Sequence, residues 1–165
     1  YDDLACPAFS FSDDFSTETA WDFTLRDGNA TSGRLHPYTK EERLHQCPTF
    51  RGQAWGRPHT GYGYNTSYIG GDPWMGRPTA SLSLIQQPSA TVLFAECGFG
   101  SPVRAANYLR APNDPLFIAG MVHARHLERA MVLWADLHAT SSRVMTSDDP
   151  TLGSLSLDDS AYDLE

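Results

Sequence analysis

Short segments of strand length, either alternating or continuously apolar, dominate the second half of the chain. They are Ser81–Ile85, where apolar and polar residues alternate, and the more continuous runs Ala90–Glu96, Leu116–Val122 and Ala130–Ala135. Segments of this length between turn residues are typical of β-strands. Asp136 and Leu137 then provide a turn, after which Ala139–Met145 is expected to return as a partner strand. The pattern predicts an antiparallel meander in the C-terminal half.

The N-terminal half has a weaker pattern. Residues 1–37 are expected to be irregular, with a turn at Asp27-Gly28 and, as an alternative, a short helix over Thr17–Leu25. A better-defined helix is predicted over Thr39–His45, because its first residues have the spacing of a capping box and Pro48 prevents it from continuing. With the predicted sheet, this short helix gives an α+β fold class.

Between Arg51 and Thr79 the chain is rich in glycine, proline and aromatic residues, which indicates a long ordered loop. Its aromatic residues are Trp55, Tyr62, Tyr64, Tyr68 and Trp74. Two interpretations stay open. The rings form a platform that binds a sugar or a protein, or they pack locally over a small core, and local packing is the commoner arrangement.

The charge distribution separates the last residues from the body of the chain. The formal net charge is −8, and residues 147–165 carry six acidic residues with no lysine or arginine, so the body is nearly neutral. We therefore expect one globular domain over 1–146 and an acidic tail over 147–165, since a chain of this length can bury a single core. The basic residues form no run, which argues against a nucleic-acid partner.

The cysteines Cys6, Cys47 and Cys97 are too few for a disulfide scaffold and lack the close spacing of a zinc knuckle or a redox motif. Their pairing and the redox compartment therefore stay open. No apolar run approaches the roughly 20 residues that span a bilayer. The first residues also lack the basic and apolar stretches of a secretory signal. Membrane association is thus expected to depend on a segment outside this sequence.

Three segments, in this order along the chain, carry a resemblance to a known family. The first contains Leu35-x-Pro37-Tyr38-Thr39-Lys40, Arg43-Leu44-His45-Gln46-Cys47-Pro48 and Gly61-Tyr62-Gly63-Tyr64-Asn65; the second is Ile85-x-x-Pro88-Ser89-Ala90-Thr91-Val92-Leu93-Phe94-Ala95-Glu96; the third is Arg125-His126-x4-Met131-Val132-Leu133-Trp134-Ala135-Asp136-x-His138. In the third, nine residues separate His126 from Asp136. Together the segments resemble type II secretion pseudopilin-like proteins of the prepilin-type processing-associated H-x9-DG family.

The resemblance implies a pilin-like globular head with a non-catalytic, structural role. The chain would serve in a type II secretion pseudopilus-like or type IV pilus-like filament, or in another surface assembly, of the bacterial cell envelope, periplasmic or extracellular. Its partners would be other pseudopilin subunits or copies of itself. They would be joined through an N-terminal apolar helix, which this sequence lacks. The same helix would make the only contact with the membrane. The chain has Leu137 where the family has glycine, so the turn type stays open.

The histidines allow a second interpretation, as a zinc site or an acid–base group. The candidates are His123, His126, His138 and Asp136. The spacing disfavours zinc, because His123 and His126 would lie on opposite faces of a strand. The sequence contains no nucleophile elbow, phosphate loop or dinucleotide motif. We expect no enzyme activity, metal or cofactor; the alternative is a small secreted binding or hydrolytic domain that uses the aromatic loop and the histidines.

Calcium binding stays open through the resemblance, since the major pseudopilins use acidic loop residues and carbonyl oxygens to bind this ion. By residue type, the candidates are Asn113-Asp114 and Asp148-Asp149. Neither position offers a full set of oxygen donors within a short stretch. Solvated acidic residues are therefore the expected outcome at both positions.

His126 and Asp136 are expected to have structural roles at opposite ends of one strand. Six extended residues span about 20 Å, so a direct contact between the two side chains is not expected. His126 is expected to bond to backbone or to a neighbouring loop. Asp136 is expected to accept amide hydrogens in the turn that leads to His138.

Overall fold

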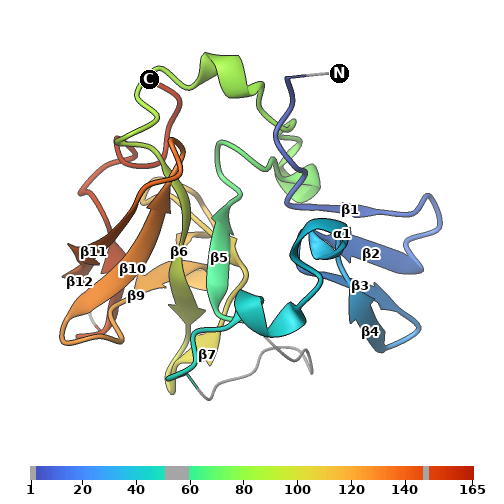
Figure 1. The fold of residues 1–165 in the computed structure, drawn as a ribbon, viewed down its shortest axis with the longest axis horizontal. Coiled ribbons are helices and arrows are strands. Elements are labelled where there is room, and N and C mark those ends of the chain that lie inside the picture. The colour runs from blue at the N-terminus through green and yellow to red at the C-terminus, as the bar shows by residue number, and fades with distance from the viewer. Residues whose placement is uncertain (1–2, 51–59, 147–148) are drawn as a thin grey trace.

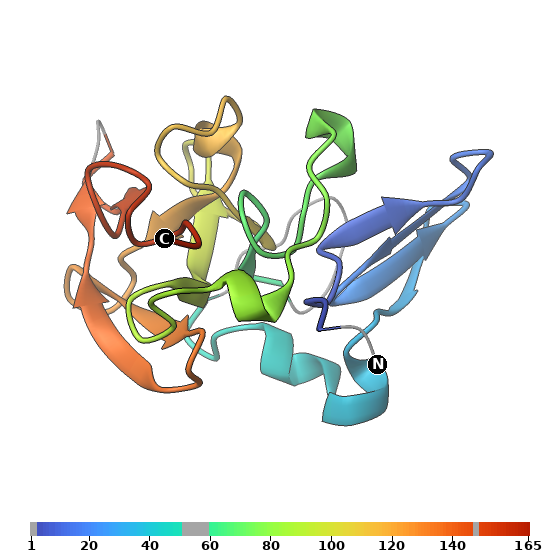
Figure 2. The same cartoon turned by 90° about the horizontal axis from the view of Figure 1, so that it is seen from above.

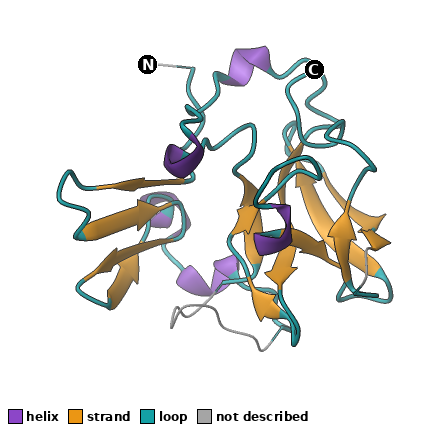
Figure 3. Cartoon of the chain, turned by 180° about the vertical axis from the view of Figure 1, so that it is seen from behind, coloured by secondary structure: helices purple, strands orange, loops and turns teal. Residues whose placement is uncertain are grey.

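The computed structural model describes residues 3–50, 60–146 and 149–165, and its strands form two sheets (Figure 1). Strands account for 36% of the described residues and helical turns for 11%. A four-stranded sheet from the N-terminal residues lies beside a curled nine-stranded sheet. No helix among the described residues exceeds four residues. Figure 3 shows in purple how few helical turns interrupt the strands and loops. The expected α+β, pilin-like head is therefore wrong, because strand pairing rather than helix packing organises the chain.

The four-stranded sheet is an antiparallel meander. It comprises β1 (Phe9–Phe11), β2 (Thr17–Ala20), β3 (Phe23–Arg26) and β4 (Asn29–Ser32), bonded in that order. Asp27 and Gly28 join β3 to β4 with φ values of 50° and 76°, the left-handed geometry that a two-residue hairpin turn requires. The irregular structure expected for residues 1–37 and the alternative helix over Thr17–Leu25 are wrong, because this turn commits the segment to hairpins.

The nine-stranded sheet is organised around its longest strand. Its members are β5 (Tyr62–Asn65), β6 (Val92–Phe99), β7 (Arg104–Ala105), β8 (Tyr108–Leu109), β9 (Met121–His123), β10 (Arg129–Trp134), β11 (Ala139–Arg143), β12 (Met145–Thr146) and β13 (Leu152–Ser154). Strand β6 pairs antiparallel with β5, β7, β9 and β10. Strand β13 connects β9 to β12, and β5 pairs in parallel with β8.

The predicted C-terminal meander is replaced by a more complex order. Strands β10 and β11 do form an antiparallel hairpin, but β6 lies between β10 and β9. Ser81–Ile85 forms the 3-10 helix η3 (Leu82–Leu84) instead of a strand, and its leucines are 46% and 58% exposed, so the alternation does not mark a buried face. Leu116–Val122 is divided between the 3-10 helix η4 (Phe117–Ala119) and β9.

Two short helical turns replace the helix expected over Thr39–His45. They are α1 (His36–Thr39) and the 3-10 helix η1 (Glu42–His45), while a further 3-10 helix, η2 (Pro73–Met75), lies in the aromatic loop. Lys40 ends α1 with a φ of 56°. A left-handed residue interrupts the helical hydrogen bonds, so η1 begins anew, with Glu41 as its N-cap and not Thr39.

Two apolar clusters stabilise the molecule, and β6 contributes to both. The cluster of the large sheet includes Val92, Leu109, Val122, Val132 and Tyr162; the cluster of the small sheet includes Phe9, Trp21, Phe23, Tyr64 and Ile69. Tyr64 of β5 stacks on Phe94 of β6 with ring centroids 4.8 Å apart, which joins the large sheet to the second cluster. Helical turns and loops occupy the region between the sheets (Figure 2).

The acidic C-terminal segment contributes to the main core. Tyr162 is 0% exposed, and its hydroxyl oxygen accepts a hydrogen bond from the Leu155 backbone at 3.0 Å. The Val92 N–H of β6 donates to the Ala161 carbonyl at 2.8 Å. Residues 149–165 thus pack against the large sheet through both backbone and side chains.

Candidate functional site

Cys47, Glu96 and His126 bring a thiol, a carboxylate and an imidazole into one small space, here called the Cys–Glu–His cluster. Cys47 follows η1, Glu96 lies in β6, and His126 lies in the turn between β9 and β10. His126 Nε2 is 2.8 Å from Glu96 Oε1 and 3.4 Å from Cys47 Sγ. All three atoms lie within 4.8 Å of one another. Each residue comes from a different one of the three segments that carry the family resemblance.

Glu96 is the most deeply buried member, with 0% exposure. Its Oε2 atom accepts a hydrogen bond from the Met131 backbone at 2.9 Å. Its Oε1 atom faces His126 and lies 3.9 Å from Nε of Arg125. A buried carboxylate is tolerated only when its charge is paired and its lone pairs are bonded. These three neighbours meet that requirement.

Arg125 forms one wall of the cluster. Its Nη2 atom donates to the carbonyl oxygens of Gly61 and Cys97 at 3.2 and 2.8 Å. Its guanidinium carbon lies 4.2 Å from the ring centroid of Phe50, a cation–π distance. Burial lowers the pKa of Arg125, while the Glu96 carboxylate acts in the opposite direction. Arg125 is therefore fixed in place beside the Glu96 carboxylate.

A strained turn positions His126. The backbones of His126 and Arg129 exchange hydrogen bonds of 3.0 and 3.1 Å, which enclose Leu127 and Glu128 in a two-residue turn. Leu127 and Glu128 have φ values of 52° and 63°, although neither is glycine. Left-handed geometry costs about 1–2 kcal/mol per such residue. Strain of this kind persists only where surrounding contacts impose it, and it concentrates at functional sites.

Asp136 lies at the other end of β10, in the turn that leads to β11. Its Oδ1 atom accepts a hydrogen bond from the His138 backbone at 3.1 Å and lies 2.5 Å from His138 Nδ1. These bonds lower the pKa of Asp136. Leu137 has a φ of 73°, so the turn keeps a left-handed residue where the resembling family has glycine. The length of β10 separates Asp136 from His126.

The three histidines do not form one group. His123, the last residue of β9, is 8% exposed, and its ring packs edge-on against Phe50 at 5.6 Å. Burial lowers the pKa of His123 to about 4, with a further contribution from Arg125, so its imidazole is neutral at physiological pH. Its Nδ1 atom is buried and has no hydrogen-bond partner among the residues that the structure describes. His138 lies at the far end of β10, beyond reach of His126.

The aromatic residues of the predicted loop do not share one surface. Tyr62 and Tyr64 lie in β5, and Tyr64 is only 3% exposed. Tyr68 donates its hydroxyl to Asp159 at 2.6 Å, which ties the loop to the C-terminal segment. Trp55 lies outside the described residues. The described tyrosines therefore serve packing and internal bonding.

Trp74 belongs to an exposed aromatic group beside the small sheet. Its ring centroid lies 4.8 Å from that of Phe11 and 6.3 Å from that of Phe15. Trp74 and Phe15 are 64% and 67% exposed. Among the described aromatic residues of the predicted platform, Trp74 alone leaves most of its surface open to solvent.

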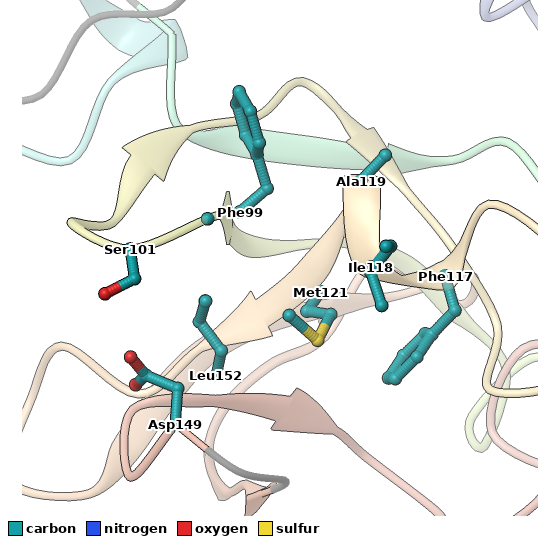
Figure 4. Close-up of a pocket in the computed structure, with 9 residues that line it drawn as sticks. Phe99, Ser101, Phe117, Ile118, Ala119, Met121, Asp149 and Leu152 are labelled. Carbon is teal, nitrogen blue, oxygen red and sulfur yellow. The ribbon is translucent and has the colours of Figure 1, made fainter.

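A separate apolar hollow of about 650 Å³ opens near η4, β9 and β13 (Figure 4). Its apolar lining includes Phe99, Phe117, Ile118, Met121 and Leu152. Asp149 and Ser101 are its polar members. Small-molecule sites usually combine an apolar lining with several convergent polar groups. The hollow has few such groups and is better suited to contact with an apolar side chain.

The candidate calcium positions are occupied by other interactions where they are described, and the solvated acid expected at Asp114 is wrong because this carboxylate is buried. Asp114 is 5% exposed, and its Oδ2 atom lies 2.5 Å from Arg77 and 3.5 Å from Arg110. Two guanidinium groups already compensate this carboxylate, which disfavours a cation there. Asp149 accepts hydrogen bonds within its own turn, and Asp148 lies outside the described residues.

The cysteines Cys6, Cys47 and Cys97 are all free thiols. Cys97 follows Glu96 on β6 and therefore points to the opposite face of the sheet. Burial raises the pKa of Cys97 to about 12. Gly63 on the neighbouring strand leaves room for it, since a Cβ atom there would lie 2.6 Å from Cys97 Cβ. Unlike Cys97, Cys47 therefore lies beside a carboxylate and an imidazole that can share a proton or a metal ion with its thiol.

Cys47 and Glu96 are the candidate residues that sequence reasoning missed. Both lie in segments that carry the resemblance, but no local spacing connects them to His126. The two contacts join residues 79 and 30 positions apart. The available signal was that each resembling segment contains at least one residue able to bind a metal or a proton.

The arrangement of the cluster differs from a catalytic relay. In a nucleophile–histidine–acid triad, the two ring nitrogens serve different partners. Here Cys47 Sγ and Glu96 Oε1 both face the same nitrogen, Nε2 of His126. The three donor atoms therefore converge on a common point instead of forming a chain.

No family model, curated protein or solved structure matches this chain. Within the described residues, no helix has the length and apolar character needed to cross a membrane.

Proposed function

We propose that this chain is the head of a non-catalytic structural subunit of a pseudopilus-like or pilus-like filament, or of another surface assembly, in the bacterial cell envelope. The observation that carries the proposal is the convergence of the three resembling segments. Cys47 comes from the first, Glu96 from the second and His126 from the third, and their side chains meet. The meeting of three segments that follow the family's order along the chain supports the proposed role, although the strand-rich fold is not that of a pilin-like head.

The engagement of the motif side chains supports a structural role. His126 contacts Glu96 at 2.8 Å, and Asp136 bonds to His138 within the β10–β11 turn. A general base must reach the proton of a substrate, directly or through one water. Both motif residues are instead used to fix the two ends of β10.

Assembly would depend on other subunits or on copies of this chain, with no nucleic acid involved. In the proposed role, an N-terminal apolar helix encoded upstream would make the main subunit contacts and the membrane contact. The exposed group of Phe15 and Trp74 would provide a lateral contact between heads, since exposed aromatic clusters are common at protein interfaces.

The most direct test is the coding sequence upstream of Tyr1. The proposal predicts a leader followed by an apolar helix of about 20 residues. The full-length protein should then be recovered from the native cell surface as cross-linked oligomers, and deletion of the helix should abolish them. A plain secretory signal immediately before Tyr1, or a full-length protein that stays monomeric at the cell surface, would contradict the proposal.

One observation favours a second candidate, a thiol-dependent hydrolase. The Cys47 thiol lies 3.4 Å from the His126 imidazole, within the range of an activated cysteine. A screen against ester, peptide and glycoside substrates separates the two functions. The structural proposal predicts no turnover. The hydrolase function would replace the structural proposal if the parent chain shows turnover, Cys47→Ser abolishes it and the matched Cys6→Ser variant retains it.

A further inference from the structure

We propose that Cys47, Glu96 and His126 form a binding site for a divalent transition metal, with zinc as the ion that their chemistry favours. A thiolate, an imidazole nitrogen and a carboxylate oxygen are the three side-chain donors that zinc uses in proteins. The inference stands on the geometry of the cluster and does not depend on the role of the chain in an assembly.

The spacing of the donor atoms fits one shared ion. In a tetrahedral zinc site, bonds of about 2.3 Å to sulfur and about 2.0–2.2 Å to nitrogen and oxygen place neighbouring ligand atoms roughly 3.3–3.7 Å apart. His126 Nε2 lies 3.4 Å from Cys47 Sγ and 2.8 Å from Glu96 Oε1. A movement of about 0.5 Å by the partly exposed His126 side chain would bring both separations into the zinc range.

The use of a single ring nitrogen is the second argument. A neutral imidazole nitrogen can donate or accept one well-directed hydrogen bond, not both at once. Nε2 of His126 nevertheless faces the sulfur and the carboxylate oxygen together. Convergence of three donor atoms on one point is the geometry of coordination, because each lone pair then points at the same ion.

Hydrogen bonds around the cluster would orient the ligands. The Met131 backbone donates to Glu96 Oε2 at 2.9 Å, which leaves Oε1 for the metal. The Thr49 hydroxyl lies 3.1 Å from Cys47 Sγ. Such outer contacts fix the direction of metal ligands and raise affinity.

Burial leaves one side of the site open. Cys47 and Glu96 are 3% and 0% exposed, whereas the His126 side chain is 34% exposed. A metal would therefore enter past His126, and a fourth position would remain for water or another small ligand. The thiolate and carboxylate would balance the charge of a divalent ion. Arg125, 3.9 Å from Glu96, would then favour an anionic fourth ligand.

The test is a titration of the reduced, metal-stripped chain with Zn²⁺ alone, read by competition with a chromophoric chelator. We expect one zinc per chain. Cys47→Ser and His126→Gln should each weaken binding by at least about 100-fold, the upper end of the loss caused by removing an outer-shell partner. The matched variants Cys6→Ser and His138→Gln remove the same groups outside the cluster and should bind as the parent does.

A second readout keeps the test independent of variant folding. Co²⁺ added to the parent chain should produce a thiolate-to-cobalt charge-transfer absorption, and alkylation of the thiols beforehand should abolish it. Circular dichroism of each metal-free variant checks that the sheets are intact; should Cys47→Ser not fold, the cobalt spectrum of the parent decides. The proposal is overturned if the parent takes up no stoichiometric zinc, if Cys47→Ser and His126→Gln both retain it, or if cobalt binds without the thiolate absorption.

Discussion

The two ends of β10 use their motif residues, His126 and Asp136, in opposite ways. At the start of the strand, His126 contacts residues 30 and 79 positions away, in a buried cluster. At its end, the Asp136 side chain bonds to His138, two positions away at the surface, while the Asp136 backbone N–H donates to the Pro88 carbonyl at 3.0 Å. Both ends contain a strained left-handed turn, at Leu127 and at Leu137. The comparison shows that one sequence motif can combine a long-range side-chain contact at one end with a local side-chain contact at the other.

The difference has energetic consequences. Removing one partner from a buried, bonded charge leaves the remaining charge unpaired, which is costly. Removing the exposed Asp136 side chain loses hydrogen bonds to His138 that water largely replaces. The His126 end should therefore be far more sensitive to substitution than the Asp136 end.

The largest expected effect is that of Glu96→Gln. The amide nitrogen of the new side chain would face either the Met131 N–H or the Arg125 guanidinium. The buried guanidinium of Arg125 would also lose the negative charge that compensates it. We expect a loss of about 3 kcal/mol in the free energy of unfolding, measured with denaturant in the presence of a chelator. The matched Glu128→Gln substitution, on an exposed residue of the adjoining turn, should change stability by less than about 0.5 kcal/mol. Equal effects would mean that Glu96 is not a buried anchor.

Substitution of Asp136 should have a smaller effect. Asp136→Ala removes the acceptor for the His138 backbone, and we expect the melting temperature to fall by about 2–4 °C. Asp136→Asn keeps an oxygen acceptor and should lower the melting temperature less than Asp136→Ala does. Thermal melts of both variants, with and without chelator, check this. A chelator effect in the parent that disappears in the Asp136 variants would mean that Asp136 binds the metal.

Leu137→Gly should stabilise the protein. The residue has a φ of 73° and is 72% exposed, so glycine relieves left-handed strain without removing buried surface. The greater freedom of glycine in the unfolded chain offsets part of this gain, and we expect a net increase of about 0.5–1 kcal/mol. Denaturant unfolding measures it. A loss of stability would show that the leucine side chain makes a contact that outweighs the strain.

The pH dependence of the Asp136 end should be the smallest effect. Hydrogen bonds from His138 hold the pKa of Asp136 below its usual value in the folded state. This stabilisation is present above the unfolded-state pKa of about 3.9 and is lost as the pH falls through the lower folded-state value. Stability should therefore fall less steeply below about pH 5 in Asp136→Asn than in the parent. Identical slopes would contradict the bonding described for this turn.

Parts of the fold could be predicted because their signals are local. The apolar run at Ala130–Ala135, the turn that follows it and the return segment identify the β10–β11 hairpin. The small sheet also had a local signal, since Asp27-Gly28 is a strong two-residue hairpin turn with strand-like residues on both sides. The apolar pattern nevertheless predicts irregular structure for residues 1–37, because the strands there are short and only partly apolar. In this segment the Asp27-Gly28 turn is therefore a better predictor of strands than the apolar content.

The order of strands in the large sheet and the membership of the cluster could not be predicted in this way. Strand β6 lies between β9 and β10, so the chain crosses the sheet before it returns. Cys47 and Glu96 reach His126 only because of that order. The sequence motif points to His126, but grouping the histidines by their proximity in sequence fails for His138, because the length of β10 separates it from His126.

Double-mutant cycles test the contrast between the two ends of β10 most directly. Unfolding free energies would be measured, with chelator present, for Glu96→Gln and His126→Ala alone and together, and for Asp136→Ala and His126→Ala alone and together. The account predicts a coupling of about 1–2 kcal/mol for the first pair and additivity within about 0.5 kcal/mol for the second. Additive effects for Glu96 and His126, or a clear coupling between His126 and Asp136, would contradict it.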